Sequence, residues 1–269
     1  MIFTFSCTGN TLWAAQIIAH TTGEKIVDIA HEMREKKEQL IYSLEQDERI
    51  GFCYPVHGWR PPGLVLDFIN RFVIENATGH YCWALCTAGD DIGQSMEILD
   101  RHLQKKGMTT NSKFSLIMPE SYVGLPFMDV DKPEKERRKR EKAATYIRLY
   151  ANTIARKEAD ITLTYKGHWP KTNSIFLGSI FKNLLISDKS FRVDSEKCIR
   201  CGRCAKVCPV DNISWQPGES PSWLHNGQCL TCFACYHHCP VKAIDYGRRT
   251  KKKGQYYYGK NISTHTKQE

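Results

Sequence analysis

The sequence predicts an α/β protein in which a doubly wound, five-stranded parallel sheet precedes a small α+β domain rich in cysteine. Three observations lead to this prediction. Short apolar stretches typical of strands alternate with helix-like stretches over residues 1–125. Loops of glycine and polar residues follow several of these strands, at the edge where open α/β sheets bind ligands. Eight of the twelve cysteines lie in two similar runs between residues 198 and 239.

The length of 269 residues allows a substantial core and a second, smaller domain. The net charge of +9 is unevenly spread, because residues 132–157 and 242–260 hold most of the excess of Lys and Arg. The sequence shows no signal peptide, and no window contains the roughly 18 apolar residues of a membrane span. We therefore expect a cytoplasmic, reducing setting and no integral membrane segment.

The first candidate site lies between a strand at residues 2–5 and a helix at residues 12–19. A helix N-terminus presents free N–H groups and a partial positive charge, which together favour an anion. The loop has no Lys or Arg, so binding would depend on neutral donors, and an ordinary capped helix is the alternative. A phosphatase with Cys7 as nucleophile is excluded, because Trp13 stands where that site needs Arg. The candidate residues are Ser6, Thr8, Gly9, Asn10 and Thr11.

Two further loops follow the buried strands predicted at residues 50–54 and 81–86. Neighbouring parallel strands end at one edge of a sheet, where ligands bind. The assigned residues are Pro55, Val56, His57, Gly58 and Trp59 in the second loop, and Thr87, Ala88, Gly89, Asp90 and Gly93 in the third.

The remaining elements complete the predicted sheet and its covering helices. Cys53, Cys82 and Cys86 fall on apolar strands and are expected in the core. Asp90 and Asp91 fit the preference of a helix N-terminus for negative charge. Further strands are expected near residues 25–29, 40–44 and 114–118, the last extended to Val123, and helices over residues 32–39, 64–72, 94–106 and 132–157.

The cysteine runs form a doubled motif. Residues 198–209 read CIRCGRCAKVCP and residues 229–240 read CLTCFACYHHCP, so each cysteine of the first run recurs 31 residues later. Three thiolates at this spacing can surround one face of an iron–sulfur cubane. Disulfides are disfavoured without a sign of secretion, and zinc sites usually pair C-x2-C motifs without a closing proline.

The doubled C-x2-C-x2-C-x3-C-P run resembles the bacterial ferredoxins with two [4Fe–4S] clusters. In that family the last cysteine of each run completes the cluster of the other run. The resemblance therefore implies two crossed ligand sets. One consists of Cys198, Cys201, Cys204 and Cys239, and the other of Cys229, Cys232, Cys235 and Cys208.

The first loop, Ser6-x-Thr8-Gly9-Asn10-Thr11, resembles the phosphate loop of flavodoxins, which holds FMN. In that family the second loop lies against the isoalloxazine ring, so the resemblance implies that Trp59 stacks on the ring with His57 close to its edge. Packing without a ligand is the alternative for a lone Trp. The order of the modules is similar to the flavodoxin–ferredoxin fusion proteins of anaerobic bacteria and archaea. This resemblance implies an electron carrier that relays single electrons between two [4Fe–4S] clusters and FMN, with an unidentified redox protein as partner. The alternatives are a flavin-dependent reductase of a small substrate and a regulatory or nucleic-acid-binding cluster protein. Nucleic acid is disfavoured, because clusters and flavin phosphate lower the net positive charge.

The expected organisation is a flavodoxin-like domain at 1–158, a connecting segment at 159–190, a cluster domain at 191–250 and a basic, aromatic tail at 251–269. The connecting segment is expected to place an amphipathic helix at the domain interface, a membrane-surface helix being the alternative. The tail is expected to be frayed and solvated, with docking of an acidic partner as the alternative. The apolar stripe of the connecting helix comprises Ile175, Phe176, Ile180, Phe181, Leu184 and Leu185.

Overall fold

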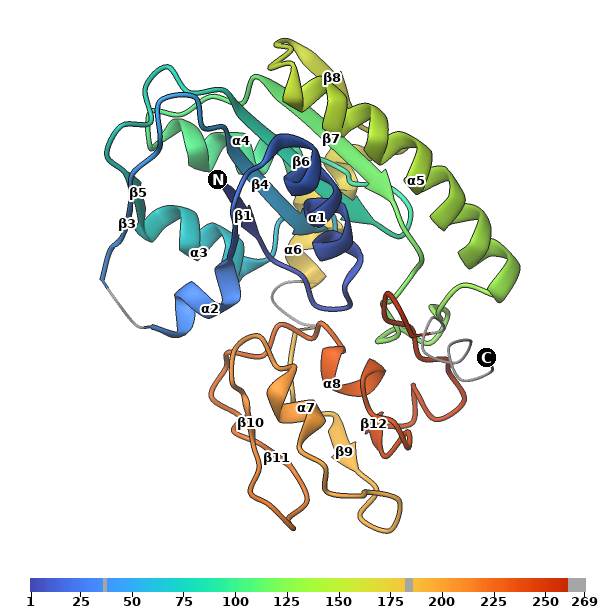
Figure 1. Ribbon diagram of the computed structural model, residues 1–269. Coiled ribbons are helices and arrows are strands. Elements are labelled where there is room, and N and C mark those ends of the chain that lie inside the picture. The colour runs from blue at the N-terminus through green and yellow to red at the C-terminus, as the bar shows by residue number, and fades with distance from the viewer. Residues whose placement is uncertain (36–37, 182–185, 261–269) are drawn as a thin grey trace, which may run out of the picture.

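A six-stranded parallel sheet forms the centre of the N-terminal domain (Figure 1). The computed structural model describes residues 1–35, 38–181 and 186–260. The strands lie in the order β2-β1-β4-β6-β7-β8, so the first five follow the 2-1-3-4-5 order of flavodoxin-like sheets. The predicted fold class is confirmed, and β8 adds a sixth strand at the edge. The strands are β1 (Ile2–Thr4), β2 (Ile26–Asp28), β4 (Ile50–Pro55), β6 (Cys82–Ala88), β7 (Ser112–Ile117) and β8 (Ile161–Leu163).

Helices cover both faces of this sheet because its strands are apolar on both sides. Side chains of successive strand residues point to opposite faces, so Ile2 packs under α1 and α5 while Phe3 packs under α3 and α4. Cys53, Cys82 and Cys86 are buried in the core, as expected. The helices are α1 (Asn10–Thr22), α2 (Ile29–Arg34), α3 (Gly63–Arg71), α4 (Ser95–Gln104) and α5 (Pro133–Ala155).

Three predicted elements differ from the structure. The strand predicted at 40–44 is β3 (Leu40–Tyr42), which pairs only with β5 (Phe72–Ile74) outside the central sheet. The expected extension to Val123 is wrong: β7 ends at Ile117, and Pro119, which has no N–H group, follows two residues later. The helix predicted at 32–39 begins at Ile29, because the side chain of Asp28 accepts the N–H of Ala30 at 2.8 Å. Residues 36–37 of that prediction lie outside the described residues.

The C-terminal domain repeats its backbone as well as its cysteines. Non-glycine residues rarely adopt a left-handed backbone, yet Arg200 and Thr231, 31 positions apart, both do so. Asp211 and Lys242 form a second such pair at the same spacing. Both halves therefore share one turn geometry around their cysteines. The elements are β9 (Phe191–Val193), α7 (Arg203–Lys206), β10 (Ile213–Ser214), β11 (Ser222–Trp223), α8 (Ala234–His237) and β12 (Ile244–Tyr246).

The connecting segment contains η1 (Thr172–Leu177), a π-helical turn, and α6 (Gly178–Ile180). Its expected burial at the domain interface is wrong for Ile175 and Phe176, whose exposed fractions are 62% and 64%. The polar Ser174 faces inward instead: its hydroxyl donates to the carbonyl of Trp59 at 3.0 Å and accepts the N–H of Gln94 at 2.7 Å. Leu184 and Leu185 of the predicted stripe lie outside the described residues. No described helix combines the length and apolar character needed to cross a bilayer.

The start of the tail is packed between the domains, so the expectation of a frayed tail is wrong for residues 251–260. The ammonium group of Lys253 donates to the carbonyl oxygens of Val123, Leu125 and Met128, at 3.0 Å and 2.6 Å for the first and last. In Figure 1 the red C-terminal segment rises beside the green loop that follows β7. Residues 261–269 lie outside the described residues.

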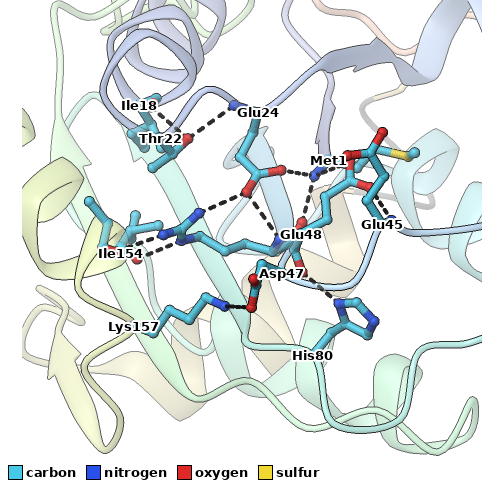
Figure 2. Close-up of polar contacts among 12 residues, drawn as sticks. Met1, Ile18, Thr22, Glu24, Glu45, Asp47, Glu48, His80, Ile154 and Lys157 are labelled. Atoms are coloured by element: carbon cyan, nitrogen blue, oxygen red, sulfur yellow. Dashed lines mark hydrogen bonds and ion pairs between the residues drawn. The ribbon is translucent and has the colours of Figure 1, made fainter.

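A polar network closes the opposite, N-terminal end of the sheet (Figure 2). The guanidinium of Arg49 pairs with Glu24 at 3.1 Å and donates to the carbonyls of Ile154 and Ala155 at 3.0 and 2.7 Å. These bonds add donors to carbonyl groups at the end of α5, where the carbonyl of Ile154 also accepts the N–H of Lys157 at 3.0 Å. Arg49 thus ties α5 to the segment that leads into β4.

Candidate cofactor sites at the domain interface

The three predicted loops converge on one cavity of about 240 Å³ at the C-terminal ends of β1, β4 and β6. All the predicted loop residues line it except Gly9 and Gly93. Gly93 lies in the third loop. That glycine lies against the side chains of Trp59 and Ser174, where a Cβ would collide with both. Gly93 therefore serves loop packing. The predicted residues that line the cavity are Ser6, Thr8, Asn10, Thr11, Pro55, Val56, His57, Gly58, Trp59, Thr87, Ala88, Gly89 and Asp90, with Gly9 between two of them.

A fourth wall was missed by the sequence prediction, which extended β7 through it. Residues 118–128 supply Pro119, Glu120, Ser121 and Tyr122 to the cavity. The signal for this wall was Pro119, which cannot donate to a strand ladder and marks a loop after β7. The other lining residues not predicted are Cys7, Asp91, Met118, Leu125, Met128, Phe181, Thr231 and Cys232.

The candidate residues of the phosphate loop differ in whether their side chains already have hydrogen-bond partners. Both polar atoms of the Asn10 side chain have partners: its amide donates to the carbonyl of Pro119 at 3.2 Å and its Oδ1 accepts the hydroxyl of Tyr256 at 2.6 Å. Thr11 and Thr87 join their hydroxyls at 2.8 Å. By contrast, the buried hydroxyl of Ser6 has no partner among the described residues. A buried hydroxyl beside the first turn of α1 fits an anionic oxygen, and no Lys or Arg lines the cavity in the described structure.

The second loop presents a neutral imidazole and an aromatic ring. Burial lowers the pKa of His57 to about 4, so this side chain is uncharged at neutral pH. Trp59 has a left-handed backbone with φ of 60°, held by the bond from Ser174 to its carbonyl. The ring of Phe181 packs against Gly58, where a Cβ would be only 2.6 Å from it. The connecting segment therefore fixes the shape of this loop.

The third loop is fixed by acidic and basic side chains. Glu120 accepts the N–H groups of Ser121 and Tyr122, both at 2.8 Å, while burial raises its pKa. Its carboxylate lies against Gly89, where any Cβ would collide with it. Lys139 donates to the carbonyl of Gly89 at 2.6 Å. The glycine is thus required for close packing beside the cavity.

The eight cysteines of the doubled motif fall into two spatial groups. A small cavity is lined by the sulfur-bearing residues Cys198, Cys201, Cys204 and Cys239, which we call the distal group. In the proximal group, burial raises the pKa of the Cys229 and Cys235 thiols, and the charge of neighbouring cysteines, Cys232 and Cys208 among them, raises both further. The proximal group comprises Cys208, Cys229, Cys232 and Cys235, so each group takes its fourth member from the other run.

The environment of these thiols fits iron–sulfur clusters. Backbone N–H groups point at sulfur, from Asn212 to Cys208 at 3.3 Å and from Ala243 to Cys239 at 3.2 Å. Such bonds stabilise thiolate ligands and tune cluster potentials. Burial raises the pKa of Cys204 to about 11, so the thiolate form there needs a cationic partner such as iron.

The proximal group meets the cavity directly. Cys232 and the neighbouring Thr231 line the cavity together with Cys7 of the first loop. The neighbouring side chain of Cys232, together with burial, raises the pKa of Cys7. Arg34 of α2 donates to the carbonyl of Cys208 at 2.8 Å. The N-terminal domain thus contacts two members of the proximal group.

The cysteine-rich domain is similar to known iron–sulfur proteins. A family model described as a 4Fe-4S dicluster domain matches residues 188–246. An uncharacterized ferredoxin of Methanocaldococcus jannaschii is 41% identical over 54 residues, which cover 19% of this chain and 70% of that protein. The pyruvate synthase subunit PorD of the same archaeon is 34% identical over 77 residues, which cover 28% of this chain and 87% of that protein.

Among solved structures, a putative flavoprotein from Bacteroides eggerthii is 17% identical and aligns with 57% of this chain and 96% of its own, at a TM-score of 0.33. A likeness at this score supports no conclusion. The assignment of the N-terminal fold therefore depends on the strand order of its own sheet.

Proposed function

Because this chain belongs to the ferredoxin family through its 4Fe-4S dicluster domain, we propose that it passes single electrons between two [4Fe–4S] clusters and an FMN bound between its domains. One observation carries the proposal. Cys232 of the proximal group and the neighbouring Thr231 line the same cavity as Ser6 and Thr8 of the phosphate-loop candidate. A flavin in that cavity would contact the protein shell of a cluster without any intervening domain motion.

The residues of the cavity have separate roles in this proposal. The first turn of α1 and the hydroxyl of Ser6 bind the phosphate, and neutral Asn10 holds the loop in shape. The second loop and Tyr122 enclose the flavin ring and exclude water. A bound cluster supplies one-electron chemistry, and a flavin accepts one or two electrons.

The positions of the two cysteine groups suggest the order in which electrons pass through them. Cys201 of the distal group is exposed, as is its neighbour Ile199 with an exposed fraction of 59%. The proximal group lies against the N-terminal domain, where Arg34 and Cys7 contact it. External redox proteins would therefore exchange electrons at the distal group, and the proximal group would connect that site with FMN.

The residues around the cavity favour a carrier over a reductase of a separate small substrate. Glu120 accepts the N–H of Ser121 at 2.8 Å and Asp91 accepts the N–H of Gly93 at 3.0 Å, so both carboxylates are engaged in loop packing.

The test is anaerobic reconstitution with iron, sulfide and FMN. We expect about eight iron atoms and about one FMN per chain. Stopped-flow reduction should show iron–sulfur absorbance changing before the flavin band bleaches when the reductant is a protein too large to enter the cavity. One cluster per chain, FAD in place of FMN, or no flavin at saturation would contradict the proposal.

A further inference from the structure

The two halves of the cysteine-rich domain present equivalent surfaces to different surroundings. In the second half this surface meets the N-terminal domain. Leu230 packs against the core beneath α3 and α4, and Thr231 lines the cavity. The imidazole of His237 is hydrogen-bonded to the carbonyl of Ser121 at 2.6 Å. The second half is therefore docked on another domain of the same chain.

The equivalent surface of the first half, 31 positions earlier in the sequence, is exposed. Ile199 takes the place of Leu230, and its side chain has an exposed fraction of 59%. Lys206 takes the place of His237. Since both halves share one turn geometry, the first half carries a copy of the docking surface beside the distal group, left uncovered by the described residues. We call this copy the distal face, and it consists of Ile199, Arg200, Arg203 and Lys206.

The distal face differs from its counterpart by its positive charge. Arg200, Arg203 and Lys206 are exposed and form no ion pair with any described residue. Asp211, the acid that follows Lys206 in the sequence, pairs with Arg34 of the N-terminal domain at 3.2 Å. Unpaired cations around an exposed apolar side chain attract a surface rich in carboxylates and repel a basic one. The charge of the distal face therefore selects an acidic partner.

We propose that the distal face binds an acidic surface of a separate one-electron carrier protein, with Ile199 as an apolar contact within a ring of charge. This inference rests on the proposed function and names the chemical class of its partner. Cys201 is exposed in the same stretch, so the bound carrier lies against the distal group. A single electron crosses this interface between the two proteins, and no bond is formed or broken.

The charge is tested by titrating the holoprotein with an oxidised, acidic two-cluster ferredoxin in a calorimeter, at about 20 and about 200 mM salt. The wild type should bind about tenfold or more weakly at the higher salt concentration. Arg203→Glu/Lys206→Glu should lose about tenfold in affinity at low salt and most of the salt dependence. The control is Arg101→Glu/Lys105→Glu, which reverses two exposed cations at the end of α4 and should bind like the wild type. Binding that ignores salt, equal losses in the two variants, or tighter binding of a basic c-type cytochrome would overturn the inference.

The apolar contact is tested by Ile199→Ser, with Ile41→Ser as the matched control because both isoleucines have an exposed fraction of 59%. Only Ile199→Ser should weaken the binding of the ferredoxin, and unchanged binding would overturn the role of this contact. Every variant should keep the iron content of the wild type and be reduced at the same rate by photoreduced deazariboflavin, a small neutral reductant that needs no docking. Loss of iron from the charge variant would also overturn the inference, by making the distal face part of a cluster site. Failure of the proposed function is distinct, since it would show as missing clusters or FMN in the wild type.

Discussion

The imidazole Nε2 of His237 lies 2.6 Å from the carbonyl oxygen of Ser121. Its Nδ1 accepts the N–H of Tyr256 at 3.1 Å, so Nε2 carries the proton and donates it to Ser121. His237 belongs to α8, between Cys235 and Cys239, whereas Ser121 belongs to the fourth wall of the cavity. One neutral side chain thus joins the cysteine-rich domain, the wall of the cavity and the C-terminal segment.

Tyr256→Phe should destabilise the protein and weaken FMN binding. The hydroxyl of Tyr256 is the donor to Oδ1 of buried Asn10, so its loss leaves that oxygen unpaired at a cost of about 1–3 kcal/mol. Urea unfolding and flavin titration measure the two effects. Tyr257→Phe is the control, because Tyr257 contributes a ring stacked on His238. Equal losses of stability and of FMN affinity in the two variants would contradict the role assigned to the Tyr256 hydroxyl.

Cys208→Ser should impair the cluster formed with Cys229, Cys232 and Cys235, although Cys208 follows the other run in sequence. The spatial grouping supports this crossed ligation. EPR of the variant should retain the signal of the distal cluster and alter that of the proximal cluster. Cys239→Ser is the reciprocal variant, and loss of the proximal signal there would refute the assignment.

Ser6→Ala should weaken FMN binding about tenfold to hundredfold, which corresponds to one hydrogen bond of about 1.5–3 kcal/mol to a charged group. Riboflavin lacks the phosphate and should bind wild type and variant alike. Thr21→Ala is the control, since that hydroxyl donates to the carbonyl of Ile17 on the surface of α1. Fluorescence titration measures both affinities. An equal loss of affinity for the two flavins would show that Ser6 does not bind the phosphate.

The affinity for FMN at neutral pH should not depend on a positive charge on His57. Burial holds its pKa at about 4, below the ordinary 6.5, so the imidazole becomes charged only as the pH falls towards 4. The ratio of FMN dissociation constants for wild type and His57→Gln should therefore stay constant between about pH 6 and 8. A ratio that changes around pH 6.5 would show that His57 titrates normally. A depressed pKa also means that the unfolded chain takes up this proton first, so His57 favours unfolding as the pH drops from 6.5 towards 4.

Arg49→Leu should lower the free energy of unfolding by about 2–4 kcal/mol, because it leaves buried Glu24 without one partner and removes the side-chain donor from two carbonyls at the end of α5. The control is Arg137→Leu, whose partner Glu141 is exposed, and a change within about 0.5 kcal/mol is expected there. Urea unfolding followed by circular dichroism measures both. Similar losses in the two variants would contradict the special role of Arg49.

Local patterns predicted much of this structure. The alternation of apolar strands and helices sufficed for the sheet, and the doubled cysteine motif predicted a cysteine-rich domain. Contacts between distant segments could not be derived in this way. Asn10 was expected to bind phosphate, but its amide is engaged by Pro119 and Tyr256, which lie 109 and 246 residues away. The apolar sequence after β7 also concealed a loop, because apolar residues suit a cavity wall as well as a strand.

The position of the C-terminal segment has a consequence for biosynthesis. Tyr258 donates its N–H to the carbonyl of Thr8 at 2.7 Å and stacks on Trp13, so residues near opposite ends of the sequence shape one loop. Domains commonly fold during translation, the N-terminal one first. Here a nascent N-terminal domain would lack these contacts until Tyr258 had left the ribosome. FMN should therefore be retained firmly only after the cysteine-rich domain has been synthesised. The two domains would then both be present before the cofactor is held.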